Sequence, residues 1–362
     1  MKNLVVIVVI VGIISTFSKV SHCYRYRSSL QIGPIIIGGG GHSRSPPLSP
    51  PPPHSTPPSP TSSKLKVGFY KGLCPNKSVD IEAIISVKVE EAFDKKPSIL
   101  PALLRMQFHD CFVHGCDASI LIDGLSSEKT AGPNLSVREY ELIDALKKVA
   151  EAQCPGVVSC ADIIAIATKE VIKKGKGLAY PVETGRRDGL IARAQDVNLP
   201  SPFGSVSESI AAFDKKNFTI EEMIVLLGCH TVGISHCVFF EDRLYEGKSL
   251  FDPEMNSTLK EELKQVCPQN KGSDNFTFLD QNPISSNLVD NSFFEQIVKN
   301  RGILPIDQAL ARDPQTKDFV NQLAQNPNLF PTLLVDAMIK LQALDVLTGD
   351  QGQIRNVCSK FN

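Results

Sequence analysis

Arg105 and His109 stand four residues apart in a largely apolar segment, which places both side chains on one face of a helix. Leu104 and Phe108 lie beside them, so a cation and an imidazole share an otherwise apolar face. Burying two such groups is costly unless they have a role, and the pair is therefore a candidate functional site. The pair alone also admits a structural arginine beside a hydrogen-bonded core histidine.

The loop after His109 combines oxygen ligands with a short cysteine clip, formed by Cys111 and Cys116. The candidate ligands are Asp110, Gly115, Asp117 and Ser119. Two carboxylates, a hydroxyl and backbone carbonyls suit a hard cation such as calcium. An ion here would hold the end of the helix beside His109, whereas the alternative is a solvated acidic loop.

His230 offers a second imidazole, in the sequence Leu-Gly-Cys-His-Thr-Val-Gly. A buried imidazole can coordinate iron, and a carboxylate on its other ring nitrogen would raise its basicity. Asp307 is a candidate for that carboxylate, although no local pattern places it near His230.

Apolar residues from Leu65 onward recur mainly at helical spacing, and the alternation typical of strands is scarce. The helices expected from this spacing are 79–93, 100–112, 140–153, 161–173, 220–227, 259–266, 292–298, 316–324 and 333–341. Thr219 and Glu222 form a capping box that starts one of them, and Gly228 stands where that helix can stop. The expected fold class is all-α.

Residues 1–23 have the profile of a secretory signal peptide, with an early lysine and an apolar run over 4–14. The run is too short to span a bilayer, and a short N-terminal anchor is the alternative because the cleavage site is poor. Residues 24–64 form a Gly/Pro/Ser-rich extension, in which nine of the residues 46–60 are proline. This composition favours a polyproline II rod similar to cell-wall extensin repeats, or a disordered spacer, and leaves 65–362 as the folded domain.

The size of the chain sets how large a core it can form, and its charge limits its binding partners. The 362 residues are 42% hydrophobic, enough to bury one large core or two smaller ones. A net charge of -1 and a pI near 6.7 lack the basic footprint of phosphate binding, so no nucleic-acid partner is expected. Binding to a membrane surface lacks support for the same reason.

Ten cysteines in an exported chain indicate disulfide bonds. Eight of them follow residue 70, apart from Cys229, and eight cysteines allow 105 pairings. Sequons for N-glycosylation, which agree with export, occur at Asn76, Asn217, Asn256 and Asn275, with a fifth at Asn134.

Taken together, these residues resemble the class III plant haem peroxidases, the secreted group that includes horseradish peroxidase. The motifs that carry the resemblance are Gly68-Phe-Tyr, Leu-Cys74-Pro-Asn, the run 105–119, Val158-Ser-Cys160-Ala-Asp162-Ile, Gly185-Arg-Arg-Asp188, His230-Thr-Val-Gly, Asp290-Asn and Gln351-Gly-Gln-Ile-Arg355. They extend in order over 65–362, and so many ordered motifs make the resemblance specific. It implies two mainly helical domains that enclose a haem b.

The resemblance implies catalytic roles for the residues singled out above. His230 is the expected proximal iron ligand, with Asp307 accepting its other N–H. His109 is expected to act as general base on hydrogen peroxide and then to return the proton to the departing oxygen, while Arg105 stabilises the developing charge. Two one-electron donors then restore the enzyme.

A hydrogen-bonded network behind the distal histidine is implied in the same way. Asn134 matches the asparagine that holds the other nitrogen of His109, and Glu128 matches the glutamate that completes the network. A glycan at Asn134 is not expected despite its sequon, because a glycan cannot occupy a buried hydrogen-bonding position.

Other residues are expected to contact the haem or the donor. Phe108 and His236 are expected against the cofactor, with His236 at a propionate, and phenolic donors are expected at the exposed haem edge near Pro200. Ser98 and Ala102 depart from the family, because they replace polar residues that can meet a propionate.

Two calcium ions are also implied. The distal ligands are Asp110, Val113, Gly115, Asp117 and Ser119, and all five positions match the family. The proximal ligands are Thr231, Asp280, Ser285, Leu288 and Asp290. Here the segment 280–290 is two residues longer than is usual in the family.

The resemblance selects one of the possible disulfide pairings: Cys74–Cys154, Cys111–Cys116, Cys160–Cys358 and Cys237–Cys267. Cys23 is expected to leave with the signal peptide. Cys229 stays unpaired beside the iron ligand, either as a small buried residue or as a site where oxidation would disturb the proximal side.

The implied function is a haem-dependent peroxidase that reduces hydrogen peroxide and oxidises phenolic donors in one-electron steps. Lignin, suberin and cell-wall cross-linking, auxin catabolism and the oxidative stress response are the expected settings. The alternative is a catalytically silent cell-wall protein with a Pro-rich arm. An intracellular ascorbate peroxidase relative is disfavoured by the signal peptide and the eight pairable cysteines.

The expected cofactors are one haem b and two calcium ions per chain. The expected partners are hydrogen peroxide and small phenols, with cell-wall polymers as further candidates. A monomer is expected, located outside the cell, in the wall or in the vacuole.

Overall fold

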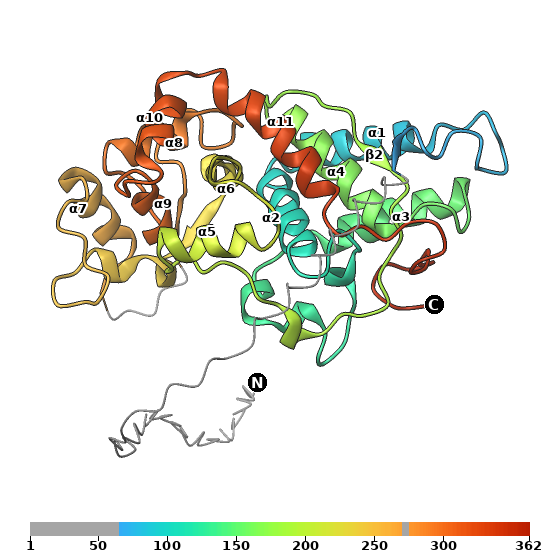
Figure 1. The fold of residues 1–362 in the computed structure, drawn as a ribbon, viewed down its shortest axis with the longest axis horizontal. Coiled ribbons are helices and arrows are strands. Elements are labelled where there is room, and N and C mark those ends of the chain that lie inside the picture. The colour runs from blue at the N-terminus through green and yellow to red at the C-terminus, as the bar shows by residue number, and fades with distance from the viewer. Residues whose placement is uncertain (1–64, 270–274) are drawn as a thin grey trace, which may run out of the picture. The chain divides into compact units, whose positions relative to one another are not determined.

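Helices account for most of the regular structure in the computed structural model, which describes residues 65–269 and 275–362 (Figure 1). These residues belong to one compact unit, Pro58–Asn362. The signal peptide and the extension predicted for 1–23 and 24–64 lie outside the described residues. The helical content confirms the expected all-α class.

The helices are named in chain order. They are α1 (Ile81–Lys95), α2 (Ile99–Cys111), α3 (Tyr140–Gln153), α4 (Cys160–Lys174), α5 (Val206–Asp214), α6 (Ile220–Leu227), α7 (Ser257–Val266), α8 (Ser292–Val298), α9 (Pro305–Leu310), α10 (Lys317–Gln325) and α11 (Leu329–Gln342). Short 3-10 helices carry several predicted site residues: η1 (Ser119–Leu121), η2 (Glu128–Thr130), η3 (Gly132–Asn134) and η5 (Gly228–Thr231).

Local sequence explains where several helices begin. The predicted capping box at α6 is present, since the Thr219 side chain accepts from the Glu222 N–H and the Glu222 carboxylate accepts from the Thr219 N–H. Ser205 and Glu208 form a second capping box at α5. Asp80 caps α1 by accepting from the Ala83 N–H. Such caps satisfy backbone donors that have no partner inside the helix.

The helices pack as two groups joined by α11. In the first group, α4 is buried over most of its length and contacts α1, α2 and α3. In the second group, α8 contacts α9, α10 and η5, while α5 contacts α6 and α9. Helix α11 packs against α6 and α2, and Figure 1 shows α2 near the middle of the helices. Helix α2, which carries the candidate catalytic pair, is thus held from both groups.

Two short antiparallel strand pairs add to the helices. Strand β1 (Lys66–Val67) pairs with β2 (Glu183–Thr184), and β3 (Ile234–His236) pairs with β4 (Phe276–Phe278). In the second pair, His236 lies opposite Phe276.

Two helices, α5 and α9, were not predicted from the sequence. Helix α9 has six residues, too few for a periodic pattern, and begins with Pro305. The sequence analysis also starts α11 too late, at residue 333 instead of Leu329. Pro331 lies in the first turn of α11, where a missing N–H breaks no intrahelical bond.

Four disulfide bonds connect segments of the described chain. The pairs are Cys74–Cys154, Cys111–Cys116, Cys160–Cys358 and Cys237–Cys267, the same four that the family resemblance implies. Cys229 is the free cysteine of the described residues. Within 65–269 and 275–362, no helix has the length and apolar character needed to cross a membrane.

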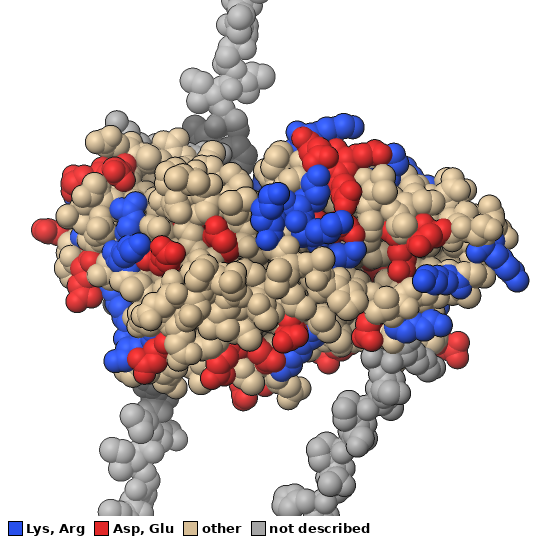
Figure 2. Space-filling model, turned by 90° about the horizontal axis from the view of Figure 1, so that it is seen from above, with Lys and Arg blue, Asp and Glu red and all other residues tan. Residues whose placement is uncertain are grey.

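Charges of both signs are distributed over the surface. On the face shown in Figure 2, acidic and basic side chains are interspersed among uncharged residues, and neither sign dominates. This distribution agrees with the net charge of -1.

Candidate active site

His109 and Asn134 meet in a hydrogen-bonded network beside the end of α2. His109 Nδ1 lies 2.7 Å from Asn134 Oδ1, and Asn134 Nδ2 donates to the backbone carbonyl of Glu128 at 2.9 Å. Because the amide nitrogen is used in the second bond, the amide oxygen faces the imidazole and accepts from its Nδ1–H. The basic nitrogen of His109 is therefore Nε2.

Arg105 lies beside that basic nitrogen, on the same face of α2 as the spacing predicts. Its Nε donates to His109 Nε2 at 3.2 Å, and its Nη2 donates to the carbonyl of Pro133 at 2.9 Å. Arg105 is exposed, whereas His109 is only 9% exposed. The guanidinium thus reaches open space next to a shielded imidazole.

Burial sets the protonation state of the pair. It lowers the pKa of His109 from 6.5 to about 3; the Arg105 charge acts in the same direction, and the hydrogen bond to Asn134 opposes both. The side chain of Arg105 is partly exposed, but desolvation by the protein around its guanidinium lowers its pKa as well, and Arg105 stays charged at neutral pH. A neutral imidazole beside a cation is the combination that a general base and a charge stabiliser require.

His230 and Asp307 form a second imidazole pair. Helix α6 runs into η5, which carries His230, and His230 Nδ1 lies 2.8 Å from Oδ1 of the buried Asp307 on α9. Burial favours the neutral imidazole, but the charge and hydrogen bond of Asp307 outweigh it and raise the pKa of His230. The structure therefore joins two residues that no local sequence pattern connected.

The two imidazole pairs suit a haem. The charge of Arg105 on α2 acts to lower the pKa of His230 on η5, so the two pairs lie within electrostatic range of each other. With Nδ1 of His230 bonded to a carboxylate, the Nε2 lone pair is left as a metal donor, and the side chain is 31% exposed. This donor set fits an iron porphyrin, whose iron His230 Nε2 would hold.

Phe108 belongs to an aromatic cluster behind the distal pair. Its ring stacks on Phe112 with centroids 4.6 Å apart and on Phe213 at 5.8 Å. It also meets the His109 ring edge-on at 6.2 Å. The His109 ring therefore contacts this cluster through Phe108.

His236 and Pro200 lie in other segments. His236 ends β3 and contacts Phe276 edge-on, with ring centroids 6.0 Å apart. Pro200, in the loop before α5, lines a cavity of about 700 Å³ together with Phe203. Phe203 is 44% exposed and stacks on Phe239 at 6.2 Å.

The predicted distal calcium ligands surround a group of buried, poorly satisfied oxygens. Asp110 accepts from Ala118 N at 3.0 Å, and Asp117 accepts from Ser119 N at 3.0 Å. In the described part of the chain, Ser119 Oγ and both carboxylate oxygens of Glu128 are buried without a well-formed hydrogen bond. Such a cluster of oxygens fits a bound cation.

Burial raises the pKa of three carboxyl groups at this site. They are Asp110, Asp117 and Glu128, the last with a pKa of about 7. For Asp110 the nearby carboxylates of Asp117 and Glu128 add to the effect. Carboxylates crowded in this way need a positive charge between them to stay ionised.

Gly115 and Val113, two further predicted calcium ligands, lie in the same loop. Gly115 has φ +104, and a Cβ there would lie 2.4 Å from the carbonyl oxygen of Asp345, so only glycine fits. The Val113 carbonyl accepts from Lys216 Nζ at 3.2 Å. A cation at this carbonyl would have to share it with Lys216.

The predicted proximal calcium ligands also come together. Thr231 Oγ1 donates to Asp290 Oδ1 at 3.2 Å and to the Leu288 carbonyl at 3.3 Å. Ser285 Oγ donates to Asp280 Oδ2 at 2.9 Å. Burial raises the pKa of both Asp280 and Asp290, as at the distal site. The longer 280–290 segment therefore still brings its oxygens to one place.

Several supporting residues were missed in the sequence analysis. Ser292 joins the two halves of the proximal cluster, since its Oγ donates to Asp280 and its N–H to Asp290. The buried Arg355 donates to the carbonyls of Ala118, Asp117 and Gly189 and so supports the distal loop. Arg355 ends the motif Gln351-Gly-Gln-Ile-Arg355, and Ser292 follows the motif Asp290-Asn, so the family motifs could have indicated both residues.

Comparison with known proteins shows the family of the chain. The family model described as Peroxidase matches residues 85–326. The chain is 45% identical to Peroxidase 57 of Arabidopsis thaliana over 302 residues, 83% of this chain and 93% of that protein. It is 46% identical to Peroxidase 28 of the same plant over 308 residues, 83% of this chain and 94% of that protein. Peroxidase 60 is 46% identical over 300 residues, 82% of this chain and 89% of that protein. The chain therefore belongs to the peroxidase family, within the class III plant haem peroxidases.

Proposed function

We propose that this peroxidase reduces hydrogen peroxide with His109 as general base and oxidises small phenols in one-electron steps. The observation that carries the proposal is the neutral His109, fixed by Asn134 and lying beside the Arg105 guanidinium. Family membership makes the chain an oxidoreductase and implies haem and calcium. The proposal assigns the individual steps to particular residues.

On the distal side, proton movement is assigned to His109. Its Nε2 takes a proton from hydrogen peroxide and returns it to the oxygen that departs as water. Arg105 stabilises the negative charge that develops as the O–O bond breaks. Asn134 keeps the Nδ1–H tautomer, so Nε2 stays the basic atom throughout. Haem b, when bound, would supply the iron at which the O–O bond is cleaved and the two electrons for that step, which two donors then return.

On the proximal side, His230 is proposed as the iron ligand and Asp307 as its support. The 2.8 Å contact to Asp307 Oδ1 fixes the ring and gives the imidazole anionic character. This increases the electron donation of Nε2 to a metal. Glu128 contributes to the distal network through its backbone carbonyl, while its carboxylate faces the proposed cation site.

Two calcium ions are proposed as structural supports. The distal ion would be held by Asp110, Val113, Gly115, Asp117 and Ser119. The proximal ion would be held by Thr231, Asp280, Ser285, Leu288 and Asp290. Each site adjoins a catalytic histidine in sequence, His109 or His230, so each ion would fix the element that presents an imidazole.

The proposal also covers the donor site and the location of the protein. Pro200 and the exposed ring of Phe203 are the proposed contacts for phenols at the haem edge, with Phe108 and His236 against the haem. Secretion to the cell wall or vacuole is proposed from the predicted signal peptide and the four disulfides, and a monomer from the absence of a heptad or exposed apolar stripe in the sequence. Nothing in the comparisons favours the alternative of a catalytically silent wall protein.

The stoichiometry of the reaction tests the proposal. Secreted protein, loaded with haem and calcium, is given a limiting amount of hydrogen peroxide and an excess of guaiacol. One-electron oxidation predicts two guaiacol molecules consumed per peroxide and coupled, radical-derived products. Transfer of an oxygen atom to the donor, or no consumption of guaiacol by the haem-loaded protein, would contradict the proposal.

A further inference from the structure

Asp307 has one oxygen bonded to His230, and its other oxygen, Oδ2, is buried without a hydrogen-bond partner in the described part of the chain. The carboxylate of Asp307 therefore has only its bond to His230, and no second hydrogen bond from the described residues holds its orientation. Its position must therefore be set by the backbone of α9. Helix α9 has only six residues, so the segments on either side of it decide where it lies.

Arg243 holds the segment that leads into α9. This arginine is 2% exposed, and its Nη1 donates to the carbonyls of Gly302, Ile303 and Leu304. Burial lowers the pKa of Arg243, and the carboxylates of Asp252 and Asp307 oppose this effect. The guanidinium thus lies close enough to Asp307 to interact with it electrostatically, without a direct bond.

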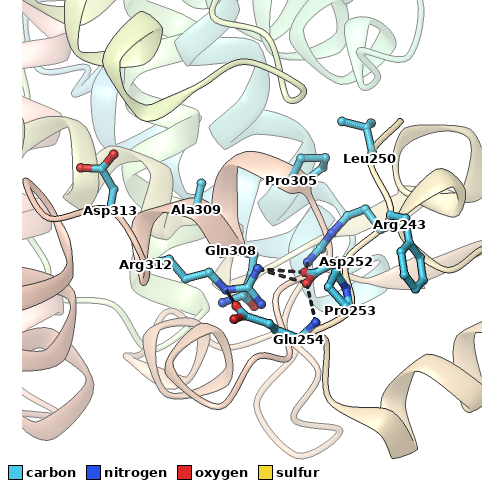
Figure 3. A pocket seen from close by; sticks show the side chains of 11 residues that line it. Arg243, Leu250, Asp252, Pro253, Glu254, Pro305, Gln308, Ala309, Arg312 and Asp313 are labelled. Carbon is cyan, nitrogen blue, oxygen red and sulfur yellow. Dashed lines mark hydrogen bonds and ion pairs between the residues drawn. The ribbon is translucent and has the colours of Figure 1, made fainter. Parts of the chain in front are cut away.

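Arg312 holds the other side, two residues after α9 ends. Its Nη1 lies 3.1 Å from each carboxylate oxygen of Asp252, and its Nη2 donates to Asn300 Oδ1 at 2.9 Å. Asp252 also accepts from Arg243 Nη2 at 2.6 Å. Figure 3 shows the two guanidinium groups converging on Asp252 beside Pro305 and Gln308 of α9. The carboxylate of Asp252 therefore connects the segment before α9 with the segment after it.

Gln308 adds a second brace to the same helix. Its Oε1 accepts from Gly302 N at 3.0 Å, and its Nε2 donates to the Ile297 carbonyl of α8 at 2.8 Å. Gln308 follows Asp307 directly in the sequence. The backbone on both sides of Asp307 is thus fixed by buried side-chain bonds.

We infer that Arg312 is a positioning residue. Acting through Asp252 and Arg243, it holds Asp307 within hydrogen-bonding distance of His230. This inference rests on the proposed role of Asp307 and adds residues outside the haem site to it. Arg243 is fully buried, whereas the side chain of Arg312 is 33% exposed beside a cavity of about 580 Å³. Arg312 can therefore be replaced without opening the core.

The test compares haem-loaded variants by the iron–histidine stretching frequency in resonance Raman spectra of the reduced protein, which reports the strength of the Asp307 bond to the iron ligand. Asp307→Asn provides the reference shift. Arg312→Gln is expected to shift the band in the same direction by a smaller amount and to slow peroxide reduction about threefold to tenfold. Arg312→Lys keeps the positive charge, and its iron–histidine band is expected to lie close to that of the wild type.

A double variant tests whether Arg312→Gln shifts the iron–histidine band by acting on Asp307. Arg312→Gln combined with Asp307→Asn is expected to give the spectrum of Asp307→Asn alone. Arg301→Gln is the matched control, because Arg301 bonds Gln296 and Asn256 in the same region but does not reach Asp252, and no shift is expected.

Three results would overturn the inference. An unshifted Arg312→Gln band beside a shifted Asp307→Asn band refutes the role of Arg312 and leaves the proposed function intact. A shift of Arg312→Gln that adds to that of Asp307→Asn means that the arginine acts by another route. An unshifted Asp307→Asn band refutes the proposed role of Asp307 itself.

Discussion

His109 Nδ1 lies 2.7 Å from Asn134 Oδ1, and Asn134 in turn donates to the backbone carbonyl of Glu128. These two bonds fix the amide and the imidazole tautomer together. Since Arg105 also donates to His109 Nε2, the geometry requires a lone pair on that atom. The network therefore defines which nitrogen of His109 can act as a base before any substrate is bound.

Replacing His109 by leucine should slow peroxide reduction by about 10²- to 10⁴-fold, because the general base is lost. His230 is untouched, so haem uptake should remain. Stopped-flow absorption after mixing with hydrogen peroxide measures the rate. A variant that reacts at nearly the normal rate would refute the role of His109.

Asn134→Val should slow the same step by about tenfold to a hundredfold, because the imidazole loses its tautomer and orientation. Ser136→Ala is the matched control: it removes the sequon but leaves Asn134 in place. Since Asn134 is 1% exposed, the control should change neither the rate nor the glycan mass carried by the secreted protein. A loss of glycan mass in Ser136→Ala would show that Asn134 is modified and would rule out the buried network.

The pH dependence follows from the pKa of His109, which burial lowers to about 3. The neutral form is the base, so the rate of peroxide reduction should be flat at acidic pH down to about pH 4 and fall below that. The unfolded chain takes up this proton near the ordinary value of 6.5 and the folded protein does not. The contribution of His109 to the free energy of unfolding is therefore full above about pH 6.5 and is lost as the pH falls toward 3.

The wild-type protein is compared with His109→Leu to isolate that group. Between pH 6.5 and 4, the free energy of unfolding of the wild type should fall by up to about 1.4 kcal/mol per pH unit more than that of the variant. A peroxide-reduction rate that declines with a midpoint near pH 6.5 would contradict the lowered pKa.

Calcium removal should lower both stability and activity. Without an ion, the raised pKa values of Asp110, Asp117 and Glu128 mean that folding takes up protons. The contribution of these three groups to the stability of the calcium-free protein is then full below the ordinary carboxyl range and is lost as pH rises through the raised values. A bound cation offsets this loss, so the stabilisation by calcium should be larger at about pH 8 than at about pH 5.

Thermal unfolding with and without a chelator measures this difference. Calcium at a hundredfold excess over its Kd should contribute about 2.7 kcal/mol per site. Asp117→Asn should remove the distal part of the effect. An unfolding temperature that does not respond to chelation at either pH would reject the two-ion proposal.

The parts of the site that could be predicted from the residues alone are local. Arg105 and His109 share a helix turn, and the distal calcium ligands follow within ten residues of His109, so spacing was enough to group each set. His230 and Asp307 are 77 residues apart, and Cys160 and Cys358 are 198 apart. Such pairs depend on tertiary packing, and only the family resemblance gave a reason to connect the two members of each pair.

The supporting residues were harder to predict because their bonds go to the backbone. Arg243 and Arg355 bind carbonyls of distant loops, and a carbonyl acceptor leaves no mark in the sequence. Helix α9, which carries Asp307, is too short to produce a periodic pattern. By contrast, α5 was missed although its Ser205 and Glu208 capping box was readable.

The visible absorption spectrum of the secreted protein, loaded with haem and calcium and mixed with one equivalent of hydrogen peroxide, tests the central claim most directly. The assignment of His109, Arg105 and His230 predicts a haem band that loses intensity within milliseconds and recovers when guaiacol is added. A protein that takes up haem but shows no change with peroxide, or that takes up no haem, would contradict it.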